Sequence, residues 1–328
     1  MKGFLPLVLL FPIALTTCKS DSQPLLPDVG GTPGDVAVVI NKADWDRKIG
    51  EEYRRIFSLP YEMLPQYEPR YDLINVPYDA FNKLFQRHRN VIFTEISPRY
   101  TKSVMLIERD RYAKPQLLIH LQAPDDTAFI RLLGTSQQKI FSYLDRAERD
   151  RLLYLHGKSQ DKNTHVKILN KHNVSLIIPK GYRIVVDTSD FTWVNQEVSS
   201  IIQGIVIYHY PFHDSADFTF KKLIPVRDNF VKKYIPGEIE GSYMTTEKEF
   251  GPHYSEYLFN GKYVAEIRGL WKTETGISMG GPFVSLSTVD EKNHRVVTIE
   301  GFVYAAGFDK RNYLRQVEAI LYSVKFPE

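Results

Sequence analysis

Apolar residues along this 328-residue chain occur in two patterns: short runs, and longer stretches in which they recur every three or four positions. The run DVAVVI at 35–40 is typical of a buried strand, because its apolar side chains can face both sides of a covered sheet. Similar runs predict further strands at 71–77, 90–97, 103–112, 115–123, 174–187, 191–194, 201–210, 254–271, 282–290 and 295–306.

The longer stretches predict amphipathic helices, because a period near 3.6 places their apolar side chains on one face. They lie at 42–57, 78–88, 125–157, 225–234 and 313–324. We expect the helix at 225–234 to begin with Pro225 in its first turn and to end before Pro236-Gly237.

Turn residues between the runs indicate how the strands connect. Asn260-Gly261 divides the run 254–271 and predicts a tight hairpin. Strands together with amphipathic helices in each half predict an α+β fold, with largely antiparallel sheets and helices packed on them.

We expect two lobes, at 35–170 and 171–328, joined through the polar stretch 157–173. The segments INVPYDAFNKLF and KLIPVRDNFVKKY both have the pattern strand, proline, helix, which would fit two related lobes. The alternative is that the two segments resemble each other by chance, because a strand followed by a proline and a helix is a common arrangement.

The N-terminus predicts export and a lipid anchor. Residues 1–17 have the charge and short apolar core of a signal peptide, which is too short to span a membrane. Leu15-Thr16-Thr17-Cys18 resembles the bacterial lipobox, although Thr17 departs from the usual Gly or Ala. We therefore predict acylation of Cys18, followed by a flexible tether to residue 34 that is rich in Ser, Pro and Gly.

Composition excludes several classes of protein. Cys18 is the only cysteine, so an internal disulfide and a cysteine-based zinc site are ruled out. With 42 basic and 39 acidic residues the net charge is +3, which favours no nucleic-acid partner. Phosphate loops, dinucleotide fingerprints and hydrolase elbows are absent from the sequence, so we expect no cofactor and no familiar catalytic site. His209 and His213 are four residues apart, a spacing that on a helix would direct both imidazoles at one metal ion. The preceding run is a predicted strand and Pro211 lies between them, so the helical geometry is not expected and we predict no metal.

Five residues are candidate ligand contacts in the second half. Gly280-Gly281 could present backbone amides to an anion, although a turn explains the glycines equally well. Arg227, expected with Asp228 in the first turn of a helix, is either a recognition residue or half of an internal ion pair. Trp193 and Trp271 lie near strand ends, where they could stack on a sugar or close the edge of the core.

The second half resembles an uncharacterised lipoprotein family of the Bacteroidota, domain of unknown function 4837. The resemblance rests on motifs in one order, GYRIVVDTSDFTWV, PVRDNFVKKYIPGEIEGSYM, RGLWKTETGISMGGPFVS and IEGFVYAAG. It implies an envelope with two membranes and provides no catalytic residue. Lys19 and Asp21, which follow the cysteine, are compatible with sorting of the lipoprotein to the outer membrane.

These features favour a lipid-anchored envelope protein that binds a ligand or supports assembly, with the membrane and an envelope protein or glycan as partners. One alternative is an enzyme acting on glycan or peptidoglycan around Arg227, Trp271 and Gly280-Gly281. It requires a cleft holding a carboxylate of raised pKa, such as that of Glu266 or Asp228. The other is a carbohydrate-binding module, which requires an exposed aromatic platform.

Overall fold

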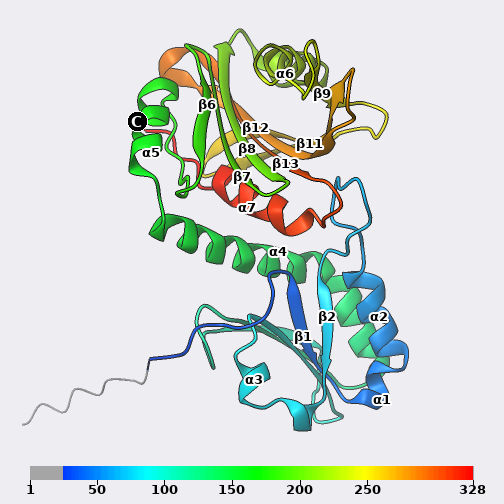
Figure 1. The fold of residues 1–328 in the computed structure, drawn as a ribbon. Coiled ribbons are helices and arrows are strands. Elements are labelled where there is room, and N and C mark those ends of the chain that lie inside the picture. Colours follow the sequence, from blue (N-terminus) through cyan, green and yellow to red (C-terminus); the bar gives the residue numbers. More distant parts are fainter. Residues whose placement is uncertain (1–24, 328) are drawn as a thin grey trace, which may run out of the picture.

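The computed structural model describes residues 25–327, which form two lobes on either side of one long helix, α4 (Asp126–Lys158) (Figure 1). Asp125 caps this helix by accepting a hydrogen bond from the backbone amide of Ala128. The signal peptide and Cys18 lie outside the described residues.

The first lobe is built on a five-stranded sheet of order β2-β1-β3-β5-β4. Its four parallel strands and the antiparallel edge strand β4 are β1 (Asp35–Val39), β2 (Asp72–Val76), β3 (Asn90–Ile96), β5 (Leu117–Ala123) and β4 (Val104–Arg109). Both faces are covered, since Val36 and Val38 join one core while Ala37 and Val39 join another. The uninterrupted apolar run at 35–40 follows from this double burial.

Helices cover one face of this sheet more fully than the other. The core on one face includes residues of α2 (Lys48–Phe57) and α4, with α1 (Lys42–Trp45) ahead of α2.

The helix predicted at 78–88 is wrong as a single element. It divides into a 3-10 turn at Tyr78–Ala80 and α3 (Lys83–Gln86), because the Asn82 side chain caps a new helix at the amide of Leu84.

The second lobe is an antiparallel sheet of order β10-β11-β12-β13-β8-β7-β6, with β9 also paired to β11. The strands are β6 (Arg183–Asp187), β7 (Phe191–Val198), β8 (Ile201–Pro211), β9 (Tyr243–Glu247), β10 (His253–Phe259), β11 (Lys262–Glu274), β12 (Gly280–Asp290) and β13 (Arg295–Ala305). The hairpin predicted at Asn260-Gly261 is confirmed, since Phe259 pairs with Lys262 and both loop residues have positive φ. The strand expected at 174–178 is absent, although Val174, Leu176 and Ile178 are buried there.

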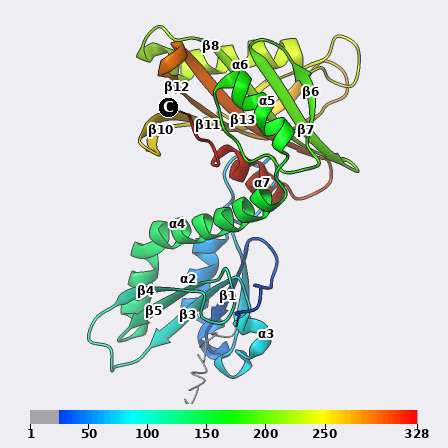
Figure 2. The same ribbon diagram turned by 90° about the vertical axis from the view of Figure 1, so that its left-hand side faces the viewer.

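Three helices pack on this second sheet. The core on one face holds residues of α5 (Lys162–His172) and α7 (Arg311–Leu321), and α7 also contacts α4 (Figure 2). The boundary expected at residue 170 falls inside α5. On the opposite face lies α6, which spans Phe220–Tyr234 and so begins five residues before Pro225. The predicted start was wrong because Leu223 and Ile224 extend the buried face, so packing outweighs the cost of an internal proline.

The fold class predicted from the sequence is confirmed: an α+β protein with largely antiparallel strands, in two lobes. The two sheets nevertheless differ in topology. Pro77 follows a strand, whereas Pro225 lies within a helix, so the shared strand-proline-helix pattern does not correspond to a shared structure.

Candidate functional site

The joint between the lobes is made by the segment 58–71, which leaves α2, reaches the second lobe and returns to β2 (Figure 1). Glu68 in this segment accepts hydrogen bonds from the backbone amides of Lys310 (2.6 Å) and Arg311 (2.8 Å). These amides begin α7, whose own residues supply no side-chain cap. One lobe therefore caps a helix of the other, where a carboxylate also suits the positive end of the helix dipole.

Side chains of α7 bind the same segment and the first residue of β2. Arg311 donates to Asp72 (2.6 Å), and Arg315 donates through Nη2 to the carbonyl oxygen of Arg70 (2.8 Å). Tyr61 donates to Glu318 (2.8 Å). The two lobes are thus joined by buried and partly buried charge-assisted hydrogen bonds, which are stronger than neutral ones.

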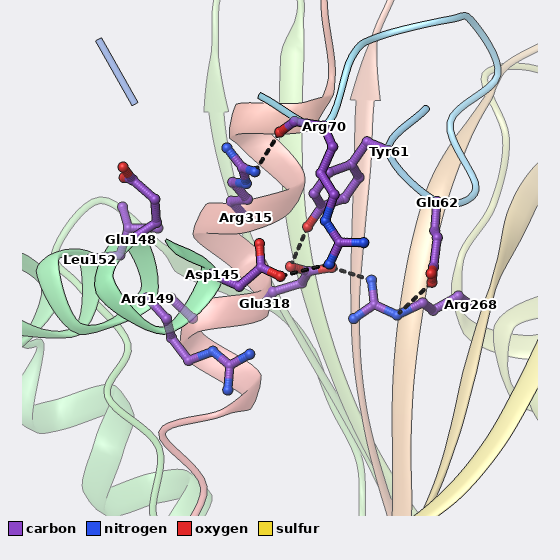
Figure 3. Close-up of a pocket in the computed structure, with 11 residues that line it drawn as sticks. Tyr61, Glu62, Arg70, Asp145, Glu148, Arg149, Leu152, Arg268, Arg315 and Glu318 are labelled. Carbon is purple, nitrogen blue, oxygen red and sulfur yellow. Dashed lines mark hydrogen bonds and ion pairs between the residues drawn. The ribbon is translucent and has the colours of Figure 1, made fainter. Parts of the chain in front are cut away.

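A partly open cavity of about 130 Å³ lies inside this joint (Figure 3). Four elements contribute to its wall: the segment 58–71, the middle of α4, strand β11 and helix α7. The lining residues are Tyr61, Glu62, Arg70, Asp145, Glu148, Arg149, Leu152, Arg268, Arg315, Glu318 and Ala319. Interfaces between domains are frequent positions for ligand sites.

Three of the four carboxylates that line this cavity already have partners on both oxygens. Asp145 accepts from Arg70 and Tyr71, each at 2.6 Å. Glu318 accepts from Tyr61 and Arg268. Glu148 also has both oxygens engaged, by Asn90, Arg151 and Arg89. The fourth, Glu62, is exposed and makes only a 4.0 Å ion pair with Arg268, so the uncommitted acceptors of the cavity are confined to its solvent-exposed part.

The arginines, in contrast, retain free donors. Within residues 25–327, Arg149 makes no hydrogen bond or ion pair, and its guanidinium lies 3.7 Å from the centre of the Tyr322 ring. Arg315 is 6% exposed, and its Nη1 is buried beside Gly34, outside the cavity lining, without a partner in the same part of the chain. The Nε of Arg70 is likewise unpartnered. The unused hydrogen-bonding capacity of the joint therefore consists mainly of donors, which match the oxygens of a carboxylate or phosphate.

One flank of the cavity is a fixed ionic network. Arg268 donates to Glu266 (2.6 Å) and to Glu318, while Tyr257 and Tyr322 donate to Glu266. Burial alone would lower the pKa of Arg268, but the two carboxylates raise it well above its usual range. Burial alone would raise the pKa of Glu266, but Arg268 and the two tyrosines lower it. Glu266 thus stays ionised and lacks the raised pKa that the enzyme interpretation required.

Arg227 is an internal ion-pair residue. It is 1% exposed and binds Glu300 through Nε (2.8 Å) and Nη2 (2.7 Å), with Nη1 donating to Thr246. Its guanidinium lies 3.8 Å from the centre of the Phe283 ring. Burial raises the pKa of Glu300 despite the charge of Arg227. The alternative of a pair between helix and sheet therefore describes this residue, which has no free donor for a ligand.

The other candidates of the second half lie in the same core. Trp271 is 3% exposed and donates from Nε1 to the carbonyl oxygen of Val303 (3.2 Å). Gly280 and Gly281 belong to strand β12 instead of a loop, and a Cβ on Gly281 would come within 2.0 Å of that same carbonyl oxygen. Trp193 is partly buried on β7. The structure brings these residues together between α6 and the sheet, and none of them lines the cavity of the joint.

The remaining polar candidates also have internal partners. Asp228 accepts from the amide and hydroxyl of Thr246 and lies in the third turn of α6, since the helix starts earlier than expected. His209 contacts His172 (3.1 Å) and His213 contacts Asp217 (3.2 Å), so the two histidines do not share a site. Among residues 25–327 no group of three or more metal-ligating side chains is present.

Sequence reasoning missed the residues of the joint. One signal was available, because Arg311, Arg315 and Glu318 interrupt the apolar stripe of α7 at helical spacing. Charged residues on a face that otherwise packs inward indicate a buried polar contact. Their partners at 61–70 and 145–149 are distant in sequence. The pattern of apolar and polar residues along the chain gave no information about which distant segments would contact α7.

The fold and the cavity define a two-lobed α+β protein with a polar joint. The chain belongs to the family described as domain of unknown function (DUF4837), whose model matches residues 159–323. A second model, also described as a domain of unknown function (DUF8532), matches residues 30–154. The cavity takes residues from both matched regions. No curated protein matches the chain in sequence.

Solved structures give only weak similarities. The Ran-binding protein Mog1p of Saccharomyces cerevisiae is 8% identical, covers 47% of this chain and 90% of its own, and has a TM-score of 0.30. Cyanobacterial PsbP (CyanoP) from Synechocystis is 9% identical, covers 51% and 90%, and has a TM-score of 0.31. Similarities this weak carry no argument about the function of this chain. Between residues 25 and 327, none of the helices combines the length and hydrophobicity needed to cross a membrane.

Proposed function

We propose that this chain is a binding protein of the bacterial cell envelope, anchored by lipid on Cys18, that holds a small oxyanion in the cavity between its lobes. We infer the lipid anchor from the N-terminal sequence and from the resemblance to Bacteroidota lipoproteins, and we propose that it lies in the outer membrane. The ligand assignment rests on one observation: three of the four carboxylates that line the cavity have partners on both oxygens, whereas the guanidinium of Arg149 makes no hydrogen bond or ion pair in the described chain.

The charges of the cavity define the kind of recognition. Four arginines and four carboxylates line it, so their formal charges cancel and long-range attraction is weak. Binding then depends on direct hydrogen bonds from guanidinium groups, for which carboxylate and phosphate oxygens are the best acceptors. A cavity of about 130 Å³ restricts the bound part to one such group.

Calorimetric titration of the full chain in detergent with citrate and with inorganic phosphate tests this proposal and separates the two oxyanion classes. We expect at least one of them to bind. Arg149→Gln should weaken it about tenfold or more, because a charge-assisted hydrogen bond is worth roughly 1.5–3 kcal/mol.

Arg146→Gln is the matched control, since Arg146 lies on the same helix with an exposed side chain, 3.9 Å from Asp150. It should leave the affinity unchanged. The proposed site would be contradicted if neither citrate nor phosphate binds. It would also be contradicted if Arg149→Gln and Arg146→Gln lower the anion affinity equally.

The anchor is tested separately in cells. Cys18→Ala should abolish incorporation of a labelled fatty acid and leave an uncleaved precursor. Continued incorporation into this variant would refute acylation at Cys18.

A further inference from the structure

A second crevice lies in the first lobe, apart from the joint. The chain passes from β1 to its neighbour β2 and then returns to β3 on the other side of β1. The connections that leave the carboxyl ends of β1 and β3 therefore diverge in opposite directions. In sheets with parallel strands, ligands bind preferentially in the crevice that such a reversal opens.

A cavity of about 280 Å³ occupies this position. All three neighbouring parallel strands contribute residues just beyond or at their carboxyl ends. The polar and aromatic side chains among them are Asn41 and Asp44 after β1, Tyr78 after β2, and Glu95, Arg99 and Tyr100 at or after the end of β3. The volume is near the lower end of the roughly 300–1,000 Å³ typical of small-ligand pockets.

The side chains after β1 are not used by the fold. Asn41 precedes α1, yet its side chain makes no capping hydrogen bond. The carboxylate of Asp44 makes no hydrogen bond or ion pair to another residue between 25 and 327. Its neighbour Asp46, by comparison, accepts from Lys42 (2.8 Å). Uncommitted polar groups in a concave site are available to a ligand.

The side chains after β3 are held in place. Glu95 accepts from Gln122 (2.6 Å), from Tyr100 (3.2 Å) and contacts His120 (3.1 Å). Burial alone would raise the pKa of Glu95, but these hydrogen bonds lower it, so the carboxylate stays ionised. Tyr78 donates to the carbonyl oxygen of Thr94, which fixes one aromatic ring at the rim.

The mixture of groups selects the ligand. Asp44 and Glu95 disfavour an anion, and the exposed guanidinium of Arg99 disfavours a cation. Acceptors, donors and aromatic rings in one crevice match hydroxyl groups, which both donate and accept, on a ring with apolar faces. We propose that this crevice binds a neutral monosaccharide unit. The proposal goes beyond the oxyanion site, with which it shares no residue.

Saturation-transfer NMR and calorimetry on the full chain in detergent test this, with N-acetylglucosamine, glucose and mannose as probes. Ethylammonium and inorganic phosphate are the charged comparisons. We expect at least one sugar to bind. Asp44→Asn should weaken it about tenfold, because it removes an ionised acceptor without changing shape.

Asp46→Asn is the matched control, at the C-cap of the same short helix and outside the crevice. It should leave sugar affinity unchanged, and so should Arg149→Gln, which separates this site from the joint. Three results would overturn the proposal: no sugar binds, Asp44→Asn and Asp46→Asn weaken the sugar equally, or only ethylammonium or phosphate responds to Asp44→Asn.

Discussion

The two lobes differ in whether the polar residues considered as candidate ligand contacts have internal partners. In the second lobe, Arg227 and Glu300 form a bidentate pair between α6 and the sheet, at 1% and 0% exposure. In the first lobe, Asn41 and Asp44 lie at the carboxyl end of a strand without side-chain partners in the described chain. Sequence motifs that suggested a site in the second lobe therefore mark its internal packing, whereas less conspicuous residues of the first lobe and the joint remain available.

The contrast follows from sheet topology. An antiparallel sheet with helices on both faces encloses polar side chains, which must then pair with one another. A sheet with parallel strands sends its connections away from one edge, and a reversal of strand order leaves an opening there.

The largest effect should come from breaking the buried ion pair. Arg227→Met leaves Glu300 unpaired in the core and should lower the free energy of unfolding by about 3–5 kcal/mol. The double variant Arg227→Met/Glu300→Leu should recover most of this loss, because apolar replacement of a whole buried pair is often neutral. Urea denaturation measures both. A double variant as unstable as the single one would show that the pair does more than compensate its own burial.

Histidines sharpen the comparison through pH. Burial, followed by the nearby charges of His209 and Lys171, lowers the pKa of His172 to about 3. The folded state keeps this ring neutral, while the unfolded chain takes up a proton below its usual pKa of about 6.5. Stability should therefore fall as pH drops from about 6.5 toward 3, by about 2 kcal/mol at pH 5.

His172→Gln should flatten this dependence relative to the wild type in denaturation measured at several pH values. In the first lobe, His120 lies between Glu95 and Glu108 and is partly exposed, so His120→Gln is the comparison variant. An unchanged pH slope in His172→Gln would contradict a neutral buried ring.

The smallest effect concerns the cap that one lobe gives to the other. Glu68→Ala removes both acceptors from the start of α7 and should cost about 0.5–2 kcal/mol. Hydrogen exchange should accelerate at Lys310 and Arg311, more than 240 residues from the substitution. Glu51→Ala, an exposed change on α2, is the control and should leave α7 unaffected. Unchanged exchange in Glu68→Ala would mean that the joint does not hold the helix.

Local signals in the sequence predicted most of the fold. The strands at 35–40 and 295–306, the hairpin at Asn260-Gly261 and the final helix follow from periodicity and turn chemistry that need no distant partner. The start of α6 was placed too late because proline punctuation outweighed Leu223 and Ile224, whose burial depends on the second sheet. Parallel pairing of β1 with β2 and β3 was not foreseen, since strand neighbours are long-range information.

The candidate sites were less predictable than the fold. Arg227, Trp271 and Gly281 were selected for their residue types, yet whether such groups are free depends on partners such as Glu300 and Val303. Arg149 was not selected, because nothing in its own neighbourhood indicates that a distant segment closes a cavity over it. Availability of a side chain is a property of tertiary packing, and only the structure reports it.

Hydrogen exchange of the full chain, with and without whichever of citrate and phosphate binds in the calorimetric titration, tests the central claim most directly. We predict slower exchange confined to 58–71, the middle of α4, the part of β11 around Arg268, and α7, because these elements enclose the cavity of the joint. Protection confined instead to α6 and β12, around Arg227 and Gly281, would place the site in the second-lobe core. That result, or no protection at all, would contradict the assignment of binding to the joint.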